Sequence, residues 1–206
     1  MHKTIYTLRH SATDAAKKKV ILGRLDEDIN EDGHALIRSF LAVHGKIPHD
    51  RLISSPLKRA LTTAKEISAG NVREVITSDL CMERNYGKLQ GVKPGELPYI
   101  TPETFYVDVG GVKHSLNPPG GETLEDVRRR AEAFMDYLFD LPGTLLVVSH
   151  QCFLVQMHGL IRNQDVYHSL ASDLGILELN RFVFKDRNMV EEEQEFSMQG
   201  NAYGSW

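Results

Sequence analysis

Short apolar runs that favour β-structure alternate along this chain with segments of helical periodicity, and this alternation limits the possible folds most. Strands are expected at residues 4–8, 51–54, 72–76 and 145–148. Asn30 is expected to cap one helix and Gly45 to end it, while Thr123 is expected to cap the helix with the clearest apolar stripe. This order predicts an α/β fold, a three-layer sandwich in which helices cover both faces of a mostly parallel central sheet.

Turn and capping residues suggest further boundaries. Ser55 is a good N-cap and Pro56 suits the first helical position, so a helix is expected from there to about residue 69. Near the C-terminus, residues 175–179 and 182–184 are expected to form two strands joined by a tight turn at 180–181. Residues 190–206 are acidic and then contain Gly and Ser, which favours a loose tail.

Length and composition exclude several classes of protein. With 206 residues, 41% of them hydrophobic and 25% charged, the chain is expected to form a single domain. A net charge of −4 predicts no nucleic-acid partner, and no apolar run is long enough to predict a membrane span. Two cysteines make no disulfide framework and no secretion signal is visible, so a cytoplasmic location is expected. The oligomeric state stays open.

The segment 84–119 differs from the rest of the chain. Gly and Pro are frequent there, periodicity is weak and aromatic residues are scattered. Long irregular segments inside a compact domain are usually functional, often as lids. We therefore expect an insertion that lies over the active site, within one domain that spans residues 1–206.

Polar and basic side chains follow three of the predicted strands. Arg9-His10 follows the first, Ser149-His150 follows the last, and the helix start at 55–59 brings Arg59 to the end of the second. Open α/β sheets place ligands at the carboxyl ends of their strands. Two imidazoles, two guanidinium groups and a helix N-terminus predict a pocket for a doubly charged oxyanion, because arginine matches phosphate geometry and helix N-termini supply backbone donors.

The same residues carry a resemblance to a known family. The motifs, which cover roughly residues 4–179, are Leu8-Arg9-His10 with Thr13, Ser54-Ser55-Pro56-Leu57-Lys58-Arg59-Ala60 with Thr63-Ala64, Glu83-Arg84-Asn85-Tyr86-Gly87-Lys88-Leu89-Gln90-Gly91, Gly120-Gly121-Glu122-Thr123 and Val148-Ser149-His150. In this order they resemble the histidine phosphatase superfamily, also called the phosphoglycerate mutase-like superfamily. The resemblance implies a metal-independent enzyme that transfers phosphoryl groups through a phosphohistidine intermediate.

The resemblance also implies a role for each site residue. His10 would be the nucleophile, and Glu83 would act as general acid and then as general base. His150 would complete the catalytic set and hold phosphoryl oxygens together with Arg9 and Arg59. The substrate- and phosphate-binding set is expected to comprise Arg9, Arg59, Ser11, Thr13, Gly23, Tyr86 and Gln151. Neither a metal nor another cofactor is expected, since cationic side chains would take its place.

Four positions depart from the family pattern. Ser11 stands where Gly usually follows the nucleophile, Ala12 where Glu is common, and Gln151 where Gly is common. Ala16 replaces an Asn that often touches the phosphoryl group. These departures predict weaker phosphate binding. They also leave open a family member that binds phosphorylated ligands or a protein partner without catalysis.

Two enzymatic alternatives concern the fate of the phosphoryl group. Cofactor-dependent phosphoglycerate mutases, which the run 83–91 resembles, carry a pair of arginines soon afterwards that grips the substrate carboxylate. Residues 95–115 contain no arginine, and only Lys93 and Lys113 offer positive charge nearby. Hydrolysis of a small phosphomonoester is therefore favoured over mutase-type transfer.

Simpler structural roles are expected for other polar residues. The alternative for Glu83 is a surface ion pair with Arg84. The arginines at 128–130 are expected on a solvated helix face. The core is expected to hold Cys81, Cys152 and Met157.

Overall fold

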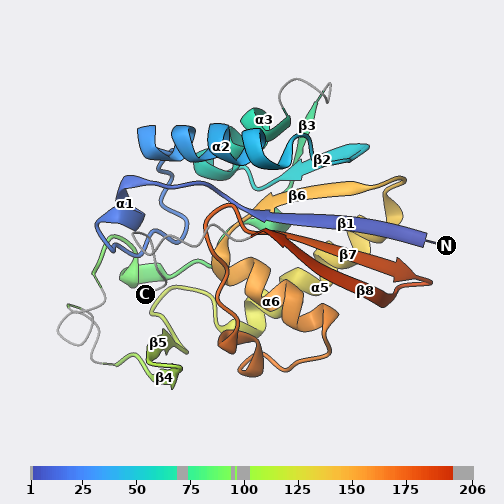
Figure 1. Ribbon diagram of the computed structural model, residues 1–206. Helices are drawn as coiled ribbons and strands as arrows, with labels where there is room; N and C mark the ends of the chain where they lie inside the picture. Colours follow the sequence, from blue (N-terminus) through green and yellow to red (C-terminus); the bar gives the residue numbers. More distant parts are fainter. Residues whose placement is uncertain (1, 69–73, 94–95, 97–102, 197–206) are drawn as a thin grey trace.

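The computed structural model describes residues 2–68, 74–93, 96 and 103–196. A 6-stranded sheet in the order β3-β2-β6-β1-β7-β8 runs through the middle of the molecule (Figure 1). Its strands are β1 (His2–Arg9), β2 (Arg51–Ser54), β3 (Val75–Thr77), β6 (Leu145–Ser149), β7 (Leu179–Lys185) and β8 (Asn188–Phe196). The first four pair in parallel, whereas β7 and β8 pair antiparallel. The prediction of a mostly parallel sheet is confirmed.

Helices cover both faces of this sheet, which confirms the three-layer sandwich. α2 (Glu31–His44) and α3 (Lys58–Ser68) lie on one face, and α5 (Leu124–Asp140) and α6 (Gln151–Ile161) lie on the other (Figure 1). Alternate side chains of a strand point to opposite faces. In β6, Leu145 and Val147 therefore join the core beneath α5 and α6, while Leu146 and Val148 join the core beneath α2 and α3.

Capping residues begin and end the predicted helices where expected. The Asn30 side chain accepts a hydrogen bond from Gly33 N, and Gly45 ends α2 with a positive φ of 66°. Thr123 and Asp126 form a reciprocal capping box at the start of α5. The predicted apolar stripe of α5 is buried and comprises Leu124, Val127, Ala131, Phe134 and Leu138.

The C-terminal part of the chain differs from the prediction. Residues 179–185 form one strand that pairs along its whole length with β1, so the turn expected at 180–181 does not occur. The turn lies instead at Asp186-Arg187, where both φ angles are positive (50° and 66°), a geometry that suits a two-residue hairpin. Residues 190–196 of the expected loose tail belong to the edge strand β8, which is held by ion pairs from Arg181 to Glu191 and Glu193. Residues 197–206 lie outside the described part.

Two other boundaries also shift. α3 begins at Lys58 rather than at Pro56, because its first helical hydrogen bond runs from Leu61 N to Leu57 O. Ser55 Oγ accepts from Leu57 N, and the carboxylate of Asp26, from a distant segment, accepts from Lys58 N at 2.8 Å. A short helix, α1 (Asp14–Lys17), occupies part of an expected loop. The predicted strand 72–76 begins at Val75 in β3, and residues 72–73 lie outside the described part.

The segment 84–119 contains regular structure. It includes a 3-10 helix (Gly87–Leu89) and a hairpin of β4 (Tyr106–Val109) and β5 (Val112–Ser115), which forms a 2-stranded sheet of its own. The hairpin lies beyond the carboxyl ends of the parallel strands, at the lower left of Figure 1. Two more 3-10 helices lie at Asp79–Cys81 and His168–Ala171. That the segment acts as a lid stays a prediction.

Candidate active site

The three predicted strand ends lie side by side at one edge of the sheet. β1, β6 and β2 are parallel neighbours, and Arg9 is in register with Ser149. His10 N donates to Ser149 O at 2.9 Å, and Ser55 N donates to Val148 O at 3.1 Å. The backbone ladder thus continues one residue past β1 and past β2, and it fixes where the following side chains begin.

The two predicted histidines face one another. The ring centroids of His10 and His150 lie 5.1 Å apart. His10 Nδ1 lies 2.7 Å from Ser11 O, and because a carbonyl only accepts, Nδ1 carries the proton and Nε2 keeps its lone pair. Burial, with the charges of Arg59 and Arg9, holds the pKa of His10 well below its usual range. The ring is therefore neutral at neutral pH and able to act as a nucleophile.

His150 is fully buried beside that ring. Its Nε2 lies 2.8 Å from Ser55 Oγ, and its Nδ1 has no hydrogen-bond partner among the described residues. Burial, followed by the charge of Arg59, holds the pKa of His150 well below its usual range. A second neutral imidazole with one unpaired nitrogen thus adjoins His10.

Arg9 and Arg59 bring two buried guanidinium groups to the same edge. Arg9 donates to Leu174 O. Arg59 donates to Leu25 O at 2.9 Å and to Gly23 O at 2.6 Å. The Nε of each arginine lacks a hydrogen-bond partner, and neither forms an ion pair with a carboxylate, within the described part of the chain. Two buried cations held only by carbonyls suit a phosphoryl group.

Glu83 is buried, with 9% of its surface exposed. Its carboxylate accepts hydrogen bonds from the backbone N–H groups of Arg84 at 2.7 Å and of Cys152 and Phe153 at 3.2 Å. The last two belong to the first turn of α6, so Glu83 caps this helix. The Arg84 guanidinium donates to Glu122 O instead, and Arg84 is itself buried. The surface ion pair considered for Glu83 is therefore not formed.

A cavity of about 780 Å³ opens at this edge. Most predicted site residues line it, namely Arg9, His10, Thr13, Gly23, Arg59, Glu83, Tyr86 and Gln151. Ser11 and His150 are not among the lining residues. The Ser11 backbone N–H donates to Thr63 Oγ1 and its hydroxyl to Gly33 O, so both donors point into the protein.

Some lining residues also serve local structure. Thr13 caps α1 with its hydroxyl, and Gly23 offers its carbonyl to Arg59. The Arg84 guanidinium lies over the Tyr86 ring, with 5.1 Å between Arg84 Cζ and the ring centroid. Burial holds the pKa of Tyr86 well above its usual range. Gln151 donates from Nε2 to a carboxylate of the loop that follows α6. These residues shape the wall of the cavity.

Apart from Lys113, the wall supplied by the hairpin was missed by sequence reasoning. The hairpin residues in the wall include Tyr106, Asp108, Lys113, His114 and Ser115. A signal for it existed, because two short runs of β-forming residues flank Gly110-Gly111, a common two-residue hairpin turn. Cys152, expected in the core, also lines the cavity, whereas Cys81 and Met157 are buried as predicted.

The prediction of a solvated face at 128–130 is wrong for two of its arginines. Arg128 is buried and donates to Gln156 Oε1 and to Ser169 Oγ. Arg130 pairs with Glu122 and lies over the ring of an α6 residue. Only Arg129 is largely exposed. The helical stripe marks the centre of the buried face, and long side chains at its margins reach neighbouring segments.

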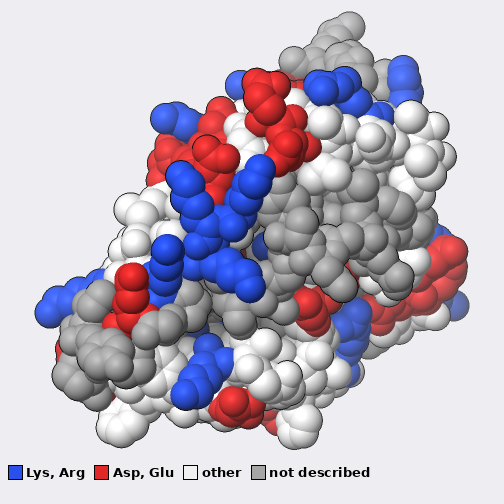
Figure 2. All heavy atoms as spheres, turned by 60° about the vertical axis from the view of Figure 1, so that its left-hand side comes forward, with Lys and Arg blue, Asp and Glu red and all other residues white. Residues whose placement is uncertain are grey.

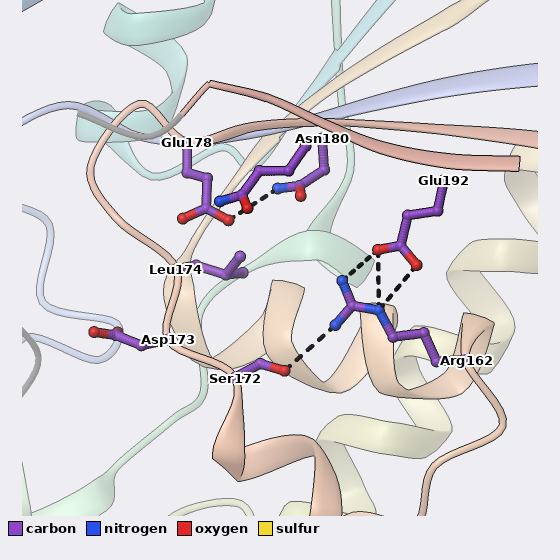
Figure 3. A pocket seen from close by; sticks show the side chains of 8 residues that line it. Arg162, Ser172, Asp173, Leu174, Glu178, Asn180 and Glu192 are labelled. Atoms are coloured by element: carbon purple, nitrogen blue, oxygen red, sulfur yellow. Dashed lines mark hydrogen bonds and ion pairs between the residues drawn. The ribbon is translucent and has the colours of Figure 1, made fainter. Parts of the chain in front are cut away.

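A second cavity, of about 420 Å³, lies next to the first and shares Ser172 with it. Figure 3 shows that Arg162 points toward Glu192 and Ser172 and that Glu178 lies beside Asn180, whereas Asp173 points away from them. Arg162 pairs with Glu192 and donates to Ser172 Oγ, and Asn180 donates to Glu178 at 3.2 Å. The hydrogen bonds around this cavity therefore hold the loop that contains Ser172 and Leu174. Arg9 donates to the Leu174 carbonyl of this loop.

The surface above the strand ends is rich in basic side chains. Figure 2 brings this side of the molecule forward, and Lys and Arg side chains gather in the middle of the view. No cluster of three or more His, Cys, Asp or Glu side chains suited to a metal ion occurs in the described ranges. None of the helices within those ranges is long and apolar enough to span a bilayer.

Comparison with known proteins agrees with this geometry. The sequence profile of the histidine phosphatase superfamily (branch 1) matches residues 5–194. Among solved structures, the Bacillus stearothermophilus protein YhfR superimposes with a TM-score of 0.79 at 18% identity, over 96% of this chain and 98% of that one. At that identity the likeness concerns the fold.

Curated relatives include both mutases and phosphatases. A bifunctional protein of Mycobacterium tuberculosis is 32% identical over 182 residues, which is 85% of this chain and 49% of the relative. The chain thus spans about half the length of that relative. A 2,3-bisphosphoglycerate-dependent phosphoglycerate mutase of Bartonella tribocorum is 27% identical, over 86% of this chain and 92% of the mutase. A phosphoserine phosphatase of Hydrogenobacter thermophilus is 30% identical, over 77% and 76%.

Proposed function

The chain belongs to the histidine phosphatase superfamily, and from this premise we propose that it hydrolyses a small phosphomonoester through a phosphohistidine formed on His10, without a metal ion. The observation that carries the proposal is the neutral, buried His10 ring, whose Nε2 keeps its lone pair beside two arginines of the cavity. Superfamily members are phosphatases or mutases, which limits the alternatives.

In the first step, His10 Nε2 attacks phosphorus. The P–N bond forms as the P–O bond to the leaving alcohol breaks, and Glu83 gives its proton to the leaving oxygen. The Ser11 carbonyl holds the proton on Nδ1, so the attacking nitrogen stays free. Arg9 and Arg59 bind the phosphoryl oxygens and stabilise the charge of the in-line transition state.

In the second step, water attacks the phosphohistidine. Glu83 takes a proton from the water, the P–N bond breaks, and inorganic phosphate leaves. We propose that His150, which lies behind the cavity wall beside the His10 ring, stabilises the phosphoryl oxygens in both steps through Nδ1, which has no partner among the described residues. Glu83 thus returns to the protonated form needed for the next turnover, and proton transfer of this kind contributes about 10²–10⁴-fold to a rate.

A mutase is the second candidate, because the mutase relative is matched over 92% of its length. A mutase must retain its bisphosphate intermediate and exclude water. Besides Arg9 and Arg59, the cavity wall holds Arg84 and Lys113. Arg84 donates to carbonyls of two neighbouring segments, so no pair of free arginines is present in the described wall to clamp a carboxylate. Hydrolysis is therefore favoured.

The test of the proposal is hydrolysis of para-nitrophenyl phosphate by the wild type and by His10→Asn, with and without EDTA. The expected loss in His10→Asn exceeds about 10³-fold, and EDTA is expected to have no effect. Intact-mass analysis should find one phosphoryl group on the wild type and none on His10→Asn. His34→Asn, on the surface of α2, is the matched control. Equal, negligible rates in wild type and His10→Asn would support a binding protein, and strong inhibition by EDTA would contradict a metal-free site.

The mutase alternative has its own test. The protein is incubated with 3-phosphoglycerate and a catalytic amount of 2,3-bisphosphoglycerate. Release of inorganic phosphate supports hydrolysis. Isomerisation without phosphate release would overturn hydrolysis in favour of mutase-type transfer.

A further inference from the structure

The β4–β5 hairpin brings three buried polar atoms to the cavity that have no hydrogen-bond partner among the described residues. These atoms are Tyr106 Oη, His114 Nε2 and Ser115 Oγ. All three residues line the same cavity as His10. Tyr106 and Ser115 are direct cross-strand partners, so both side chains leave the hairpin on one face. Only 5% of the Ser115 surface is exposed.

Such atoms are unusual in a folded protein, because buried polar groups are normally paired. The Asp108 carboxylate, at the turn of this hairpin, has such a partner, because its Oδ1 accepts a hydrogen bond from Gly111 N at 2.9 Å. The atoms left without a partner belong to residues of the cavity wall. Polar atoms of a ligand held against the hairpin would supply the partners that these atoms lack.

The rest of the wall indicates the chemistry of that ligand. Apolar side chains also line the cavity, namely Ile21, Leu22, Leu89, Val112, Val155 and Leu170. Two hydroxyls and an imidazole can donate to oxygen atoms, and Lys113 adds a positive charge at the same strand. A cavity of about 780 Å³ has room for a whole small metabolite besides the phosphoryl group.

We propose that Tyr106 and Ser115, which share one face of the hairpin, form a second subsite, which binds hydroxyl or carboxylate oxygens of the leaving group. The substrate is then the phosphomonoester of an oxygen-rich alcohol, a sugar or a hydroxy acid, rather than of a simple apolar alcohol. This inference rests on the proposed phosphatase function of the site. These two residues determine specificity and take no part in the bond-breaking steps.

The test compares the double variant Tyr106→Phe/Ser115→Ala with the wild type on phenyl phosphate, glucose 6-phosphate and 3-phosphoglycerate. The expected loss of kcat/KM is about tenfold or more on one of the two oxygen-rich substrates, with phenyl phosphate changed less than about twofold. A loss on glucose 6-phosphate identifies a sugar subsite. A loss on 3-phosphoglycerate that Lys113→Met reproduces identifies a carboxylate subsite.

The matched control is Tyr167→Phe/Ser39→Ala, whose hydroxyls lie outside the cavity wall, one just before the 3-10 helix His168–Ala171 and the other on α2. Because the hairpin hydroxyls have no hydrogen-bond partner within the part of the chain that the structure describes, the double variant is expected to keep the Tm of the wild type. A lower Tm with unchanged selectivity would assign the hydroxyls a structural role and overturn the subsite. Equal losses on all three substrates would overturn it as well.

The inference can fail separately from the proposed function. Hydrolysis of all three substrates in the same ratio by wild type and variant would contradict the subsite and leave the phosphatase standing. A wild type that hydrolyses none of them would contradict the phosphatase. Calorimetric titration with glucose 6-phosphate and 3-phosphoglycerate then decides the subsite, since binding to the wild type that the variant loses supports it, and equal binding or none contradicts it.

Discussion

At the scale of single residues, the site is defined by atoms that the protein leaves unpaired. Arg9 Nε, Arg59 Nε and His150 Nδ1 are buried near His10 and have no hydrogen-bond partner among the described residues. An unsatisfied buried donor costs roughly 1–3 kcal/mol. A bound anion would remove the cost of this set around one imidazole, so we expect the cavity to bind a phosphoryl group more tightly than a neutral ligand.

Glu83 provides a test at this scale. Glu83→Gln keeps the shape of the side chain and one acceptor oxygen for the α6 backbone but removes the proton donor. We expect kcat to fall by about 10²–10⁴-fold for alkyl phosphates, whose leaving groups need a proton, and much less for para-nitrophenyl phosphate. Steady-state kinetics on both substrates measure the difference. Glu132→Gln, exposed on α5, is the control, and an equal loss on both substrates would remove Glu83 from the acid role.

At the scale of elements, the start of α6 organises the site. His150 occupies the N-cap position of α6 without a side-chain cap, and Glu83 caps the helix from a distant segment. One helix terminus therefore fixes the positions of both His150 and Glu83, the proposed general acid. The position of Glu83 consequently depends on how the segment 83–91 packs against its neighbours.

Gly87 tests that packing. Its φ is +52°, and a Cβ there would lie 2.1 Å from Pro119 O. We expect Gly87→Ala to lower the free energy of unfolding by about 3 kcal/mol and to reduce activity, because the segment that holds Glu83 must move. Urea denaturation and phosphatase assays measure both effects.

Gly120 is the matched control for this prediction. Its φ is +72°, but nothing lies within 4 Å of an added Cβ. Gly120→Ala is therefore expected to lower the free energy of unfolding through backbone strain alone, by about 1–2 kcal/mol, and to leave activity intact. Equal effects of the two substitutions would show that the contact with Pro119 does not matter.

At the scale of the whole molecule, burial of histidine between the sheet and α6 makes stability depend on pH. His158 Nε2 lies 2.8 Å from Thr7 Oγ1, and burial lowers the pKa of His158 to about 3. The pKa values of His10 and His150 shift in the same direction. The unfolded chain therefore binds more protons than the folded one below the ordinary histidine pKa of about 6.5.

The sign of the pH effect follows. The contribution of neutral His158 to the free energy of unfolding is fully present above about pH 6.5 and is lost as the pH falls toward 3. The loss is about 1.4 kcal/mol per pH unit for each such group. Urea denaturation between pH 7 and about pH 4 should show a shallower loss for His158→Gln than for the wild type. His168→Gln, at an exposed position, should match the wild type. Identical pH slopes for His158→Gln and the wild type would contradict the prediction.

The sequence by itself determined the elements whose signals are local. The caps at Asn30 and Thr123, the apolar stripe of α5 and the parallel strands ending at Arg9 and Ser149 were all predictable, because capping and periodicity depend on residues a few positions apart. The convergence of the strand ends was predictable as well, since parallel neighbours end at the same edge of a sheet.

Only the tertiary structure decided the rest. β8 exists because β7 offers it a partner, and Arg128 is buried because α6 lies beside it. Glu83 became a helix cap, and the hairpin became a cavity wall, through contacts between residues tens of positions apart. Such contacts leave no periodic signal within either segment, because each segment contributes only one of the two groups that interact. Burial of the neutral His10 ring depends on the same long-range packing.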